Sequence, residues 1–501
     1  NAQIQSGEGF WIALCRAVAS VLLGNPDSFE GVTGPFASRF RQLNDKGVDL
    51  LLRGDTHTIE REVKERTTGS SFTFSSPYYY DGLAYAGDET FVSCAQEQKR
   101  FDECSDLRIC VAQGSSTRDF LMRSFPPEFI LAVPLKLSLM TELLLNGTCN
   151  AIASDRSALF GIDAPRNGSA NFVVGDRLFT KEPLAMVTRN ADREFSDVAN
   201  WVVQALFYGE ERGLTKDSSL CRTYANSTSH RASDLNFMNA VRCVGNYGDI
   251  FEEDDRGMNR INDGTSGMLY ATPFGRLRTE MFASVAGDAF LDVVRRKGAL
   301  NCGVVVPNDF DGDIEGSVDG LVGMSVDYCR TVTTALFHGH SEPVTLIPLS
   351  AAGGDDGPFA ALDSGSVDVL AGARVEKKYD FKSSNSFASF GGVQFSTPYY
   401  FGDEAAGEDV SFYSLATRED DAAFSSFVNI AVLSTIYAQE KGMEREQSEE
   451  AWVVRDAIDY SGSHYQLFAK NFPNVSEEER GRNRLNSAGG PQIHSFPGLA
   501  P

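Results

Sequence analysis

The side chains most able to form covalent bonds in this 501-residue chain are its nine cysteines. No two of them form a CxxC motif, and four N-x-[ST] acceptor sequences for N-glycosylation accompany them, at Asn146, Asn167, Asn226 and Asn474. Many cysteines without a redox or metal-binding spacing are typical of disulfides, which persist outside the reducing cytosol. Cysteines and sequons together predict a secreted or periplasmic protein that carries disulfides and glycans. The cysteines stand at positions 15, 94, 104, 110, 149, 221, 243, 302 and 329.

No arrangement of residues in the sequence predicts catalysis. The chain contains no GxSxG, Walker A or HExxH motif, and none of its six histidines belongs to a recognisable triad. His338 and His340 flank one glycine, but two ligands in a single loop do not complete a metal site. We therefore expect a protein that is not an enzyme and that needs neither a metal nor a cofactor.

Length and charge narrow the class of protein further. A chain of 501 residues is longer than a domain with a single hydrophobic core, so two to four domains are expected. The formal net charge of −24 argues against binding to nucleic acid or to anionic membrane surfaces. The two most apolar stretches, 11–24 and 129–145, are short or interrupted by charged residues and proline, so no membrane span is expected.

Two parts of the sequence resemble each other. FSSPYYY (74–80) parallels FSTPYYF (395–401), an offset of 395 − 74 = 321 residues. Further along, TRNADREF (188–195) parallels TREDDAAF (417–424), an offset of only 417 − 188 = 229 residues. The difference, 321 − 229 = 92, is the number of residues that the second copy lacks between these two landmarks.

The patterns of apolar residues predict alternating helices and strands, and therefore an α/β fold. Helices are expected over 11–23, 36–46 and 196–212, and strands over 48–52, 106–113 and 149–154. The GSST segment at 114–117 reads as a turn that opens a helix.

The first copy resembles the bacterial periplasmic amino-acid-binding proteins of the general L-amino-acid type. These belong to solute-binding family 3 and have the type II periplasmic-binding-protein fold. The segments that carry the resemblance occur in the family's order: GFWIALCRAVASVLLG, RGDTHTIERE, YYYDG, ICVAQGSST, KEPLAMVTR, VGNYGDIFE and GMLYATP, between Gly9 and Pro273.

This resemblance implies a clamshell of two α/β lobes joined by crossing strands, with the ligand held between them. In residues 1–278, lobe one would comprise 1–85 and 190–278, and lobe two would comprise 86–189. The 92 residues missing from the second copy, 279–501, correspond to lobe two. With one wall only, that copy cannot desolvate a zwitterion, and it is predicted to be a non-binding scaffold or docking module.

The resemblance also implies a binding site drawn from both lobes. Arg61 stands where the family places the arginine that grips the ligand's carboxylate, and Thr56 matches a threonine that assists it. Ser116 lies in the helix opening of lobe two, where free backbone amides favour an anion. Asp155 matches the aspartate that takes the ligand's α-ammonium group. A ligand that contacts all four would bridge the lobes and close them.

Taken without the resemblance, these residues have ordinary interpretations. Arg61 has Glu60, Glu62 and Glu65 nearby and reads as a surface ion-pair partner. GSST reads as a helix cap, and Asp155 as a turn or cap residue.

Three positions depart from the family pattern. Asp55 replaces a usual threonine, and its carboxylate is placed to pair with Arg61 and weaken its grip on a ligand. His57 stands where the family often has tryptophan. In the second copy Asp380 falls near the position of Arg61, so the site is expected to be lost there.

The second copy contains KGALNCGVVVPND (297–309), which resembles the family's first strand, and the first copy shows no counterpart. A missing inner strand exposes hydrogen-bonding edges. Either residues upstream of Asn1 or another chain, in a homo-oligomer or an assembly, would supply it.

The cysteines agree with this comparison, since Cys302 on that strand and Cys329 on the next helix look like a pair. Cys15 is the counterpart of Cys329, and its partner would lie on the absent strand. The remaining cysteines are expected to pair as Cys94–Cys104, Cys110–Cys149 and Cys221–Cys243.

Two functional hypotheses follow. In the first, the chain is a secreted solute-binding protein whose first copy captures a free amino acid. In the second, it is an extracellular structural or assembly protein built from a binding fold that no longer binds a ligand.

Overall fold

The computed structural model describes most of the chain in segments separated by gaps. The described residues are 9–58, 61–62, 65, 67–97, 104–134, 137–162, 172–180, 182–211, 213–221, 235–253, 290–308, 310, 313–316, 319–351, 357–374, 393–402, 412–418, 422–443, 452–476, 479–480 and 483–484. The predicted domain boundary at 278/279 lies outside them. The first half below means the described residues up to 253, and the second half those from 290.

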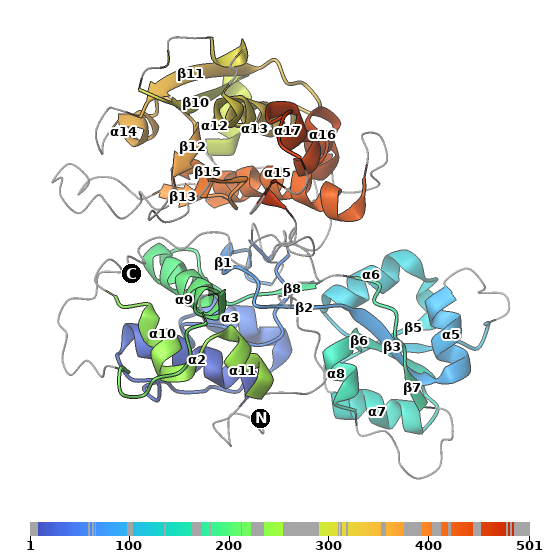
Figure 1. Ribbon diagram of the computed structural model, residues 1–501. Helices are drawn as coiled ribbons and strands as arrows, with labels where there is room; N and C mark the ends of the chain where they lie inside the picture. The colour runs from blue at the N-terminus through green and yellow to red at the C-terminus, as the bar shows by residue number, and fades with distance from the viewer. Residues whose placement is uncertain are drawn as a thin grey trace.

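Three bodies are visible in the ribbon diagram (Figure 1). Two α/β lobes make up the first half, in blue and green on the left and in cyan on the right, and the second half lies above them in yellow to red. Two antiparallel strands, β2 (Tyr79–Asp81) and β8 (Glu182–Leu184), carry the chain between the two lower lobes. The first half therefore has the two-lobed architecture of a type II periplasmic-binding-protein clamshell.

Lobe two is built on a five-stranded sheet in the order β5-β4-β6-β3-β7. Strand β4 pairs in parallel with β5 and β6, whereas β3 pairs antiparallel with β6 and β7. The elements are β3 (Leu83–Asp88), α5 (Glu89–Glu97), β4 (Ile109–Ala112), α6 (Ser116–Ser124), η2 (Pro127–Phe129), β5 (Ile130–Val133), α7 (Leu137–Leu145), β6 (Ala151–Asp155), α8 (Arg156–Phe160) and β7 (Phe172–Val174).

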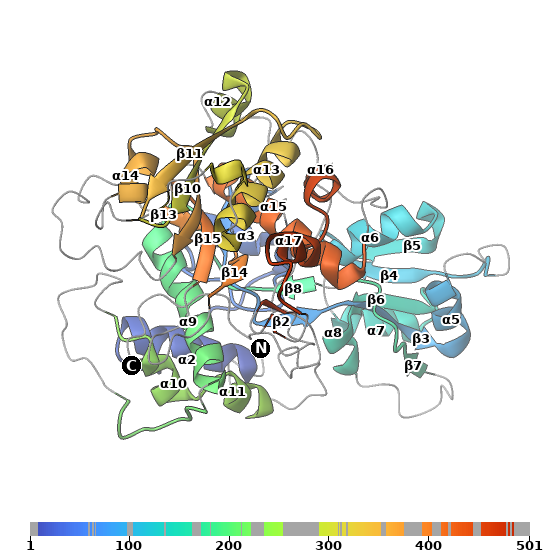
Figure 2. The same cartoon turned by 45° about the horizontal axis from the view of Figure 1, so that its top comes forward.

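Helices cover both faces of this sheet because successive strand side chains point to opposite sides. Leu83 and Tyr85 pack with α5 and α6 on one face. Ala84 and Ala86 pack with α7 and α8 on the other. The turned view shows the two pairs of helices on either side of the sheet (Figure 2).

Lobe one has short strands and long helices. Strand β1 (Phe72–Phe74) pairs antiparallel with β9 (Val187–Arg189), and Leu51 and Thr56 form isolated bridges to Val187 and Leu184. The main helices are α2 (Phe10–Leu22), α9 (Arg193–Glu211), α10 (Met238–Val244) and α11 (Tyr247–Glu253), which enclose one apolar core. The 3-10 helix η1 (Phe36–Ser38) and α3 (Arg39–Asn44) cover the opposite side.

The second half is built on one sheet in the order β11-β10-β12-β15-β13, with β14 also paired to β15. Helix α14 packs on one face, and α13, α15 and α17 pack on the other. The elements are α12 (Phe290–Lys297), β10 (Leu300–Val306), η5 (Ile314–Gly316), α13 (Gly320–Leu336), β11 (Val344–Ser350), α14 (Gly357–Asp363), β12 (Val369–Arg374), β13 (Val393–Phe395), β14 (Tyr400–Phe401), β15 (Phe412–Arg418), α15 (Ala422–Lys441), α16 (Trp452–Ser461) and α17 (His464–Asn471).

Several hydrogen bonds recur in the two halves at residues that the sequence comparison equates. The Thr188 and Ser196 hydroxyls lie 2.6 Å apart, as do those of Thr417 and Ser425. The amide of Ser76 donates to Asn200 at 2.7 Å.

The corresponding pair in the second half, Thr397 and Asn429, lies at 2.8 Å. Tyr247 donates to the Tyr78 carbonyl, and His464 contacts the corresponding Tyr399 carbonyl at 2.8 Å. The two halves thus share local contacts as well as sequence motifs.

The position of β10 explains why one predicted strand does not form. In the second half β10 lies between β11 and β12 and pairs with both in parallel. The first half has no strand in that position among its described residues, so the edge at 50–56 pairs on one side only. The predicted strand at 48–52 is therefore wrong in extent, since Leu51 makes only a single bridge.

The four predicted cysteine pairs are disulfides in the structure, and all nine cysteines lie within its described residues. The bonds join Cys94–Cys104, Cys110–Cys149, Cys221–Cys243 and Cys302–Cys329. Cys15 is a free, partly buried thiol on α2. Its counterpart, Cys329, is bonded to Cys302 on β10, the strand that has no equivalent in the described part of the first half.

Two of the four sequons can be placed. Asn146 and Asn474 are both exposed, and the Asn146 side chain accepts hydrogen bonds from Thr148 within its own sequon. Asn167 and Asn226 lie outside the described residues, and glycosylation stays a prediction. None of the described helices has the length and apolar character needed to cross a membrane.

We expect Cys15 to react slowly in the native protein, because burial raises its pKa to about 11 and leaves little thiolate at pH 8. Alkylation of the native, unreduced protein should be about a hundredfold slower than that of an ordinary exposed thiol. Unfolding in urea without reductant should then allow one label per chain, measured by mass spectrometry. Rapid native labelling, or more than one label before reduction, would contradict this arrangement.

Candidate functional site

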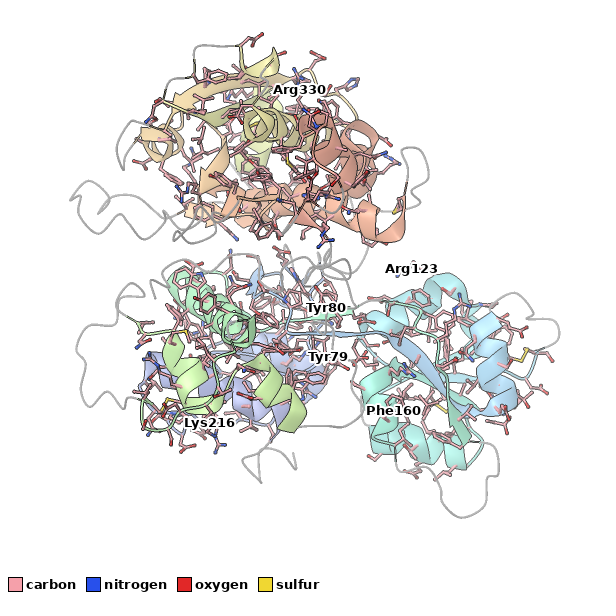
Figure 3. All side chains as sticks on the ribbon, viewed as in Figure 1. Tyr79, Tyr80, Arg123, Phe160, Lys216 and Arg330 are labelled. Carbon is pink, nitrogen blue, oxygen red and sulfur yellow. A yellow bond between two sulfur atoms is a disulfide. The ribbon has the colours of Figure 1, made fainter. Side chains whose placement is uncertain are left out.

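The crossing strands bring three carboxylates together where the two lobes meet. In the β2–β8 pair Asp81 lies opposite Glu182, and in the β3–β6 pair Leu83 lies opposite Asp155. Tyr79 and Tyr80, labelled in Figure 3, mark the strand that passes from one lobe to the other. Strand register therefore gathers residues that are more than 70 positions apart in the sequence.

Glu182 is the centre of this group and is completely buried. Its Oε2 atom accepts hydrogen bonds from the Thr56 hydroxyl of lobe one at 2.8 Å and from the Ser116 hydroxyl of lobe two at 2.7 Å. The Thr180 hydroxyl donates to Oε1 at 3.0 Å. A single carboxylate thus ties the two lobes together.

Ser116 reaches this position because the GSST segment forms a helix cap at the carboxyl end of β4. The Ser115 side chain accepts the Arg118 backbone amide at 3.1 Å, which makes it the N-cap of α6. Gly114 adopts a φ of 74°, a conformation that glycine reaches without strain. The predicted turn and helix opening are both present, and Ser116 is the first helical residue.

Arg61 is held from its own lobe. Its Nη1 donates to the Thr56 carbonyl at 2.5 Å, and its backbone amide donates to the Thr58 hydroxyl at 3.1 Å. The guanidinium lies over the Phe40 ring, 5.2 Å from its centroid. Within the described parts of the chain the side chain of Arg61 makes no other hydrogen bond, so nitrogens remain available at the lobe junction.

The expectation that Asp55 pairs with Arg61 is wrong. Asp55 forms a buried ion pair with Arg39, whose guanidinium also lies 3.5 Å from the centroid of the Phe36 ring. Burial lowers the pKa of Arg39 to about 10, against the opposing effect of Asp55. The aromatic stacking and the ion pair hold Arg39 beside Asp55, which leaves Arg61 unpaired by that carboxylate.

Asp155 lies on the lobe-two side of the site. It is the last residue of β6, it is partly exposed, and its side chain does not cap the following helix. Burial raises its pKa well above the ordinary range, and the nearby carboxylates of Glu182 and Asp81 raise it further. Arg61 and Arg39 act in the opposite direction. Among the described residues, no cationic side chain forms an ion pair with Asp155.

The other two carboxylates also carry raised pKa values, and burial is the first cause in both. Asp81 is stabilised by hydrogen bonds from the Ser157 hydroxyl and from the Gly82 amide, the latter at 2.8 Å. Hydroxyl donors stabilise the charged form of Glu182 in the same way. The site therefore combines a positive group on lobe one with negative groups on lobe two and on the crossing strands.

His57 connects the site to the second half of the chain. Its ring stacks on Phe74 with centroids 4.3 Å apart, and its Nε2 lies 2.7 Å from Glu62. Ser426 of α15 donates a hydrogen bond to the other oxygen of Glu62. The second half thus contacts the residue that directly follows Arg61.

The structure therefore brings Arg61, Thr56, Ser116 and Asp155 to one junction between the lobes. Sequence reasoning missed Glu182 and Asp81. Glu182 lies inside KEPLAMVTR, a segment already recognised in the resemblance, but a glutamate next to a lysine reads as a surface residue until its burial is known. Asp81 likewise lies inside YYYDG, a segment recognised in the resemblance without any role given to its aspartate.

Comparison with known proteins supplies the biochemical context. No protein-family model matches the chain. A glutamate/glutamine/aspartate/asparagine-binding protein of Rhodobacter capsulatus is 28% identical over 295 residues, which covers 53% of this chain and 84% of that protein. A general L-amino acid-binding periplasmic protein of Rhizobium johnstonii is 27% identical over 294 residues, covering 53% and 83%.

Over about half of its length, this chain is similar in sequence to bacterial amino-acid-binding periplasmic proteins. Among solved structures, a periplasmic binding protein from Brucella ovis with glutathione bound is 26% identical. It covers 49% of this chain and 80% of its own, with a TM-score of 0.38.

The raised pKa of Asp155 predicts a stability that depends on pH. The folded state binds this proton more tightly than the unfolded chain, so the wild type loses stability as pH rises from the ordinary aspartate range through the raised pKa. Asp155→Asn cannot titrate, and we expect its free energy of unfolding to exceed that of the wild type at pH 8.

Thermal unfolding of both proteins between pH 5 and pH 8 measures this difference. Asp106→Asn, which changes an exposed aspartate of the same lobe, should show no pH-dependent difference. A difference between Asp155→Asn and wild type that stays constant across this range would contradict the prediction.

Proposed function

We propose that the first half binds a free amino acid between its two lobes, and that the second half is a non-binding scaffold or docking module. The observation that carries this proposal is the pair Arg61 and Asp155. Each comes from a different lobe, and the charge of Arg61 opposes the rise in the pKa of Asp155 that burial and the neighbouring carboxylates cause. An amino acid carries the two complementary charges on adjacent atoms.

In this proposal each end of the ligand meets one lobe. The guanidinium nitrogens of Arg61 that are not bonded to Thr56 receive the α-carboxylate, and Asp155 receives the α-ammonium group. Because neither lobe holds both groups, the ligand stabilises the arrangement in which the lobes are close. Thr56 and Ser116 belong to the same proposed site, where they hold Glu182.

A non-binding role for the second half is supported by its architecture. Its described residues form one sheet with helices on both faces, and they include no second lobe opposite it. The segment that would correspond to Arg61, including Asp380, lies outside the described residues. Ser426 contacts Glu62 of the first half, which is consistent with a docking role for α15.

The proposed location is outside the cytoplasm, in a periplasm or as a secreted protein. Four disulfides support this placement, and so do the relatives that are periplasmic binding proteins. We propose no catalytic role, and the proposed partner is a free amino acid. A homo-oligomer or assembly partner that supplies or covers the missing first strand stays a prediction.

The second candidate is an extracellular structural or assembly protein that no longer binds a ligand. One observation favours it, since Thr56 and Ser116 already have a carboxylate partner within the chain.

Isothermal titration calorimetry with a panel of L-amino acids separates the two candidates. We expect at least one amino acid to bind the wild type with one site per chain. Arg61→Ala should weaken it by at least tenfold, because a charge-assisted hydrogen bond to the carboxylate is lost. Arg41→Ala, which removes an exposed guanidinium from the same lobe, serves as the control and should bind as the wild type does.

Two results would count against the proposal. Absence of heat with every amino acid would favour the structural candidate. Two sites per chain would contradict the non-binding role of the second half.

A further inference from the structure

We propose that Glu182 is a specificity-determining residue of this site. Its carboxylate already accepts the hydrogen bonds that the Thr56 and Ser116 hydroxyls can donate. The site therefore binds the amino groups of its ligand more strongly than the carboxylate groups. It therefore prefers ligands whose amino groups outnumber their carboxylates. This inference rests on the proposed binding function and names the ligand class for it.

The first support is a count of hydroxyl protons. A threonine or serine hydroxyl has one proton to donate. Both Thr56 and Ser116 donate theirs to Oε2 of Glu182, at 2.8 Å and 2.7 Å. A ligand carboxylate that approached these two hydroxyls would meet oxygen lone pairs, which repel it.

The second support is that Glu182 is firmly held. Its side chain is fully buried, and its donors come from lobe one, from α6 of lobe two and from Thr180 just before β8. Its backbone is fixed by the β2–β8 pairing opposite Asp81. Moving the carboxylate aside for a ligand would leave a buried charge without donors, which is costly.

The third support is the balance of charge around the junction. Asp81 and Glu182 are close enough to raise the pKa of Asp155, whereas the two cations that lower it are Arg61 and Arg39. Arg39, the other nearby cation, is bound to Asp55. At low effective dielectric this excess of carboxylates favours an ammonium group and disfavours an additional carboxylate.

Arg61 remains able to receive one ligand carboxylate, but it acts without the two hydroxyls. An α-amino acid therefore binds with its carboxylate held by Arg61 alone, and this carboxylate contributes less to the binding free energy than the amino group. Basic amino acids and simple amines should therefore bind better than dicarboxylic amino acids.

Two matched ligand pairs test this inference on the wild-type protein by calorimetry. L-Arginine and agmatine differ only by the α-carboxylate, and we expect agmatine to bind between about tenfold and a hundredfold more weakly, because only the contact with Arg61 is lost. L-Glutamine and L-glutamate differ by a side-chain charge, and we expect glutamate to bind at least tenfold more weakly. Rejection of agmatine by more than a hundredfold, or glutamate binding as tightly as glutamine, would overturn the proposal while leaving amino-acid binding intact.

Two variants separate the contributions of Glu182. Glu182→Gln keeps a hydrogen-bond acceptor but removes the charge, so glutamate should gain about tenfold relative to glutamine. Glu182→Ala frees both hydroxyls, so the preference for arginine over agmatine should rise by about tenfold. Glu128→Gln removes an exposed charge at the amino-terminal end of β5 and should change neither ratio.

Circular dichroism spectra confirm that each variant is folded, and the wild-type ligand pairs remain decisive if Glu182→Ala is not. Unchanged ratios in both folded variants would overturn the role of Glu182. Absence of binding by any ligand to any of these proteins would overturn the binding function and this inference together.

Discussion

A buried carboxylate that needs donors from two separate lobes is the interaction on which the site depends. Glu182 accepts one hydrogen bond from the hydroxyl of Thr56 and one from that of Ser116, which belong to different lobes, and neither alone would compensate for its burial. This requirement fixes the approach of α6 to Thr56. It also fixes the positions of Arg61 and Asp155, since one follows Thr56 and the other lies beside the crossing strands.

Burial of the carboxylates at this junction has a cost in stability. Burial raises the pKa of Asp81, Asp155 and Glu182, so each is less stable as an anion in the folded protein than in water. Two of the three have hydroxyl or amide donors, whereas Asp155 has a position that a ligand's ammonium group would complement. Residues whose environment disfavours their charge are frequent at functional sites for this reason.

Some contacts of lobe one recur in the second half of the chain. It retains the buried hydroxyl pair Thr417–Ser425 and the amide contact between Thr397 and Asn429, both of which orient the long helix against the sheet. These contacts stabilise one lobe by itself. The described residues of the second half include no second lobe, so these contacts form without one.

The sequence by itself determined the α/β class, the cysteine pairs and the helix opening at GSST. These features depend on local patterns or on one comparison along the chain, and both are visible in the order of residues. Only the tertiary structure decided that Asp55 pairs with Arg39, that the 48–52 segment is not a full strand, and that Glu182 lies at the centre of the site. The physical reason is that partner choice among buried charges depends on distances between segments, such as the 126 residues between Thr56 and Glu182, which only the packed fold brings together.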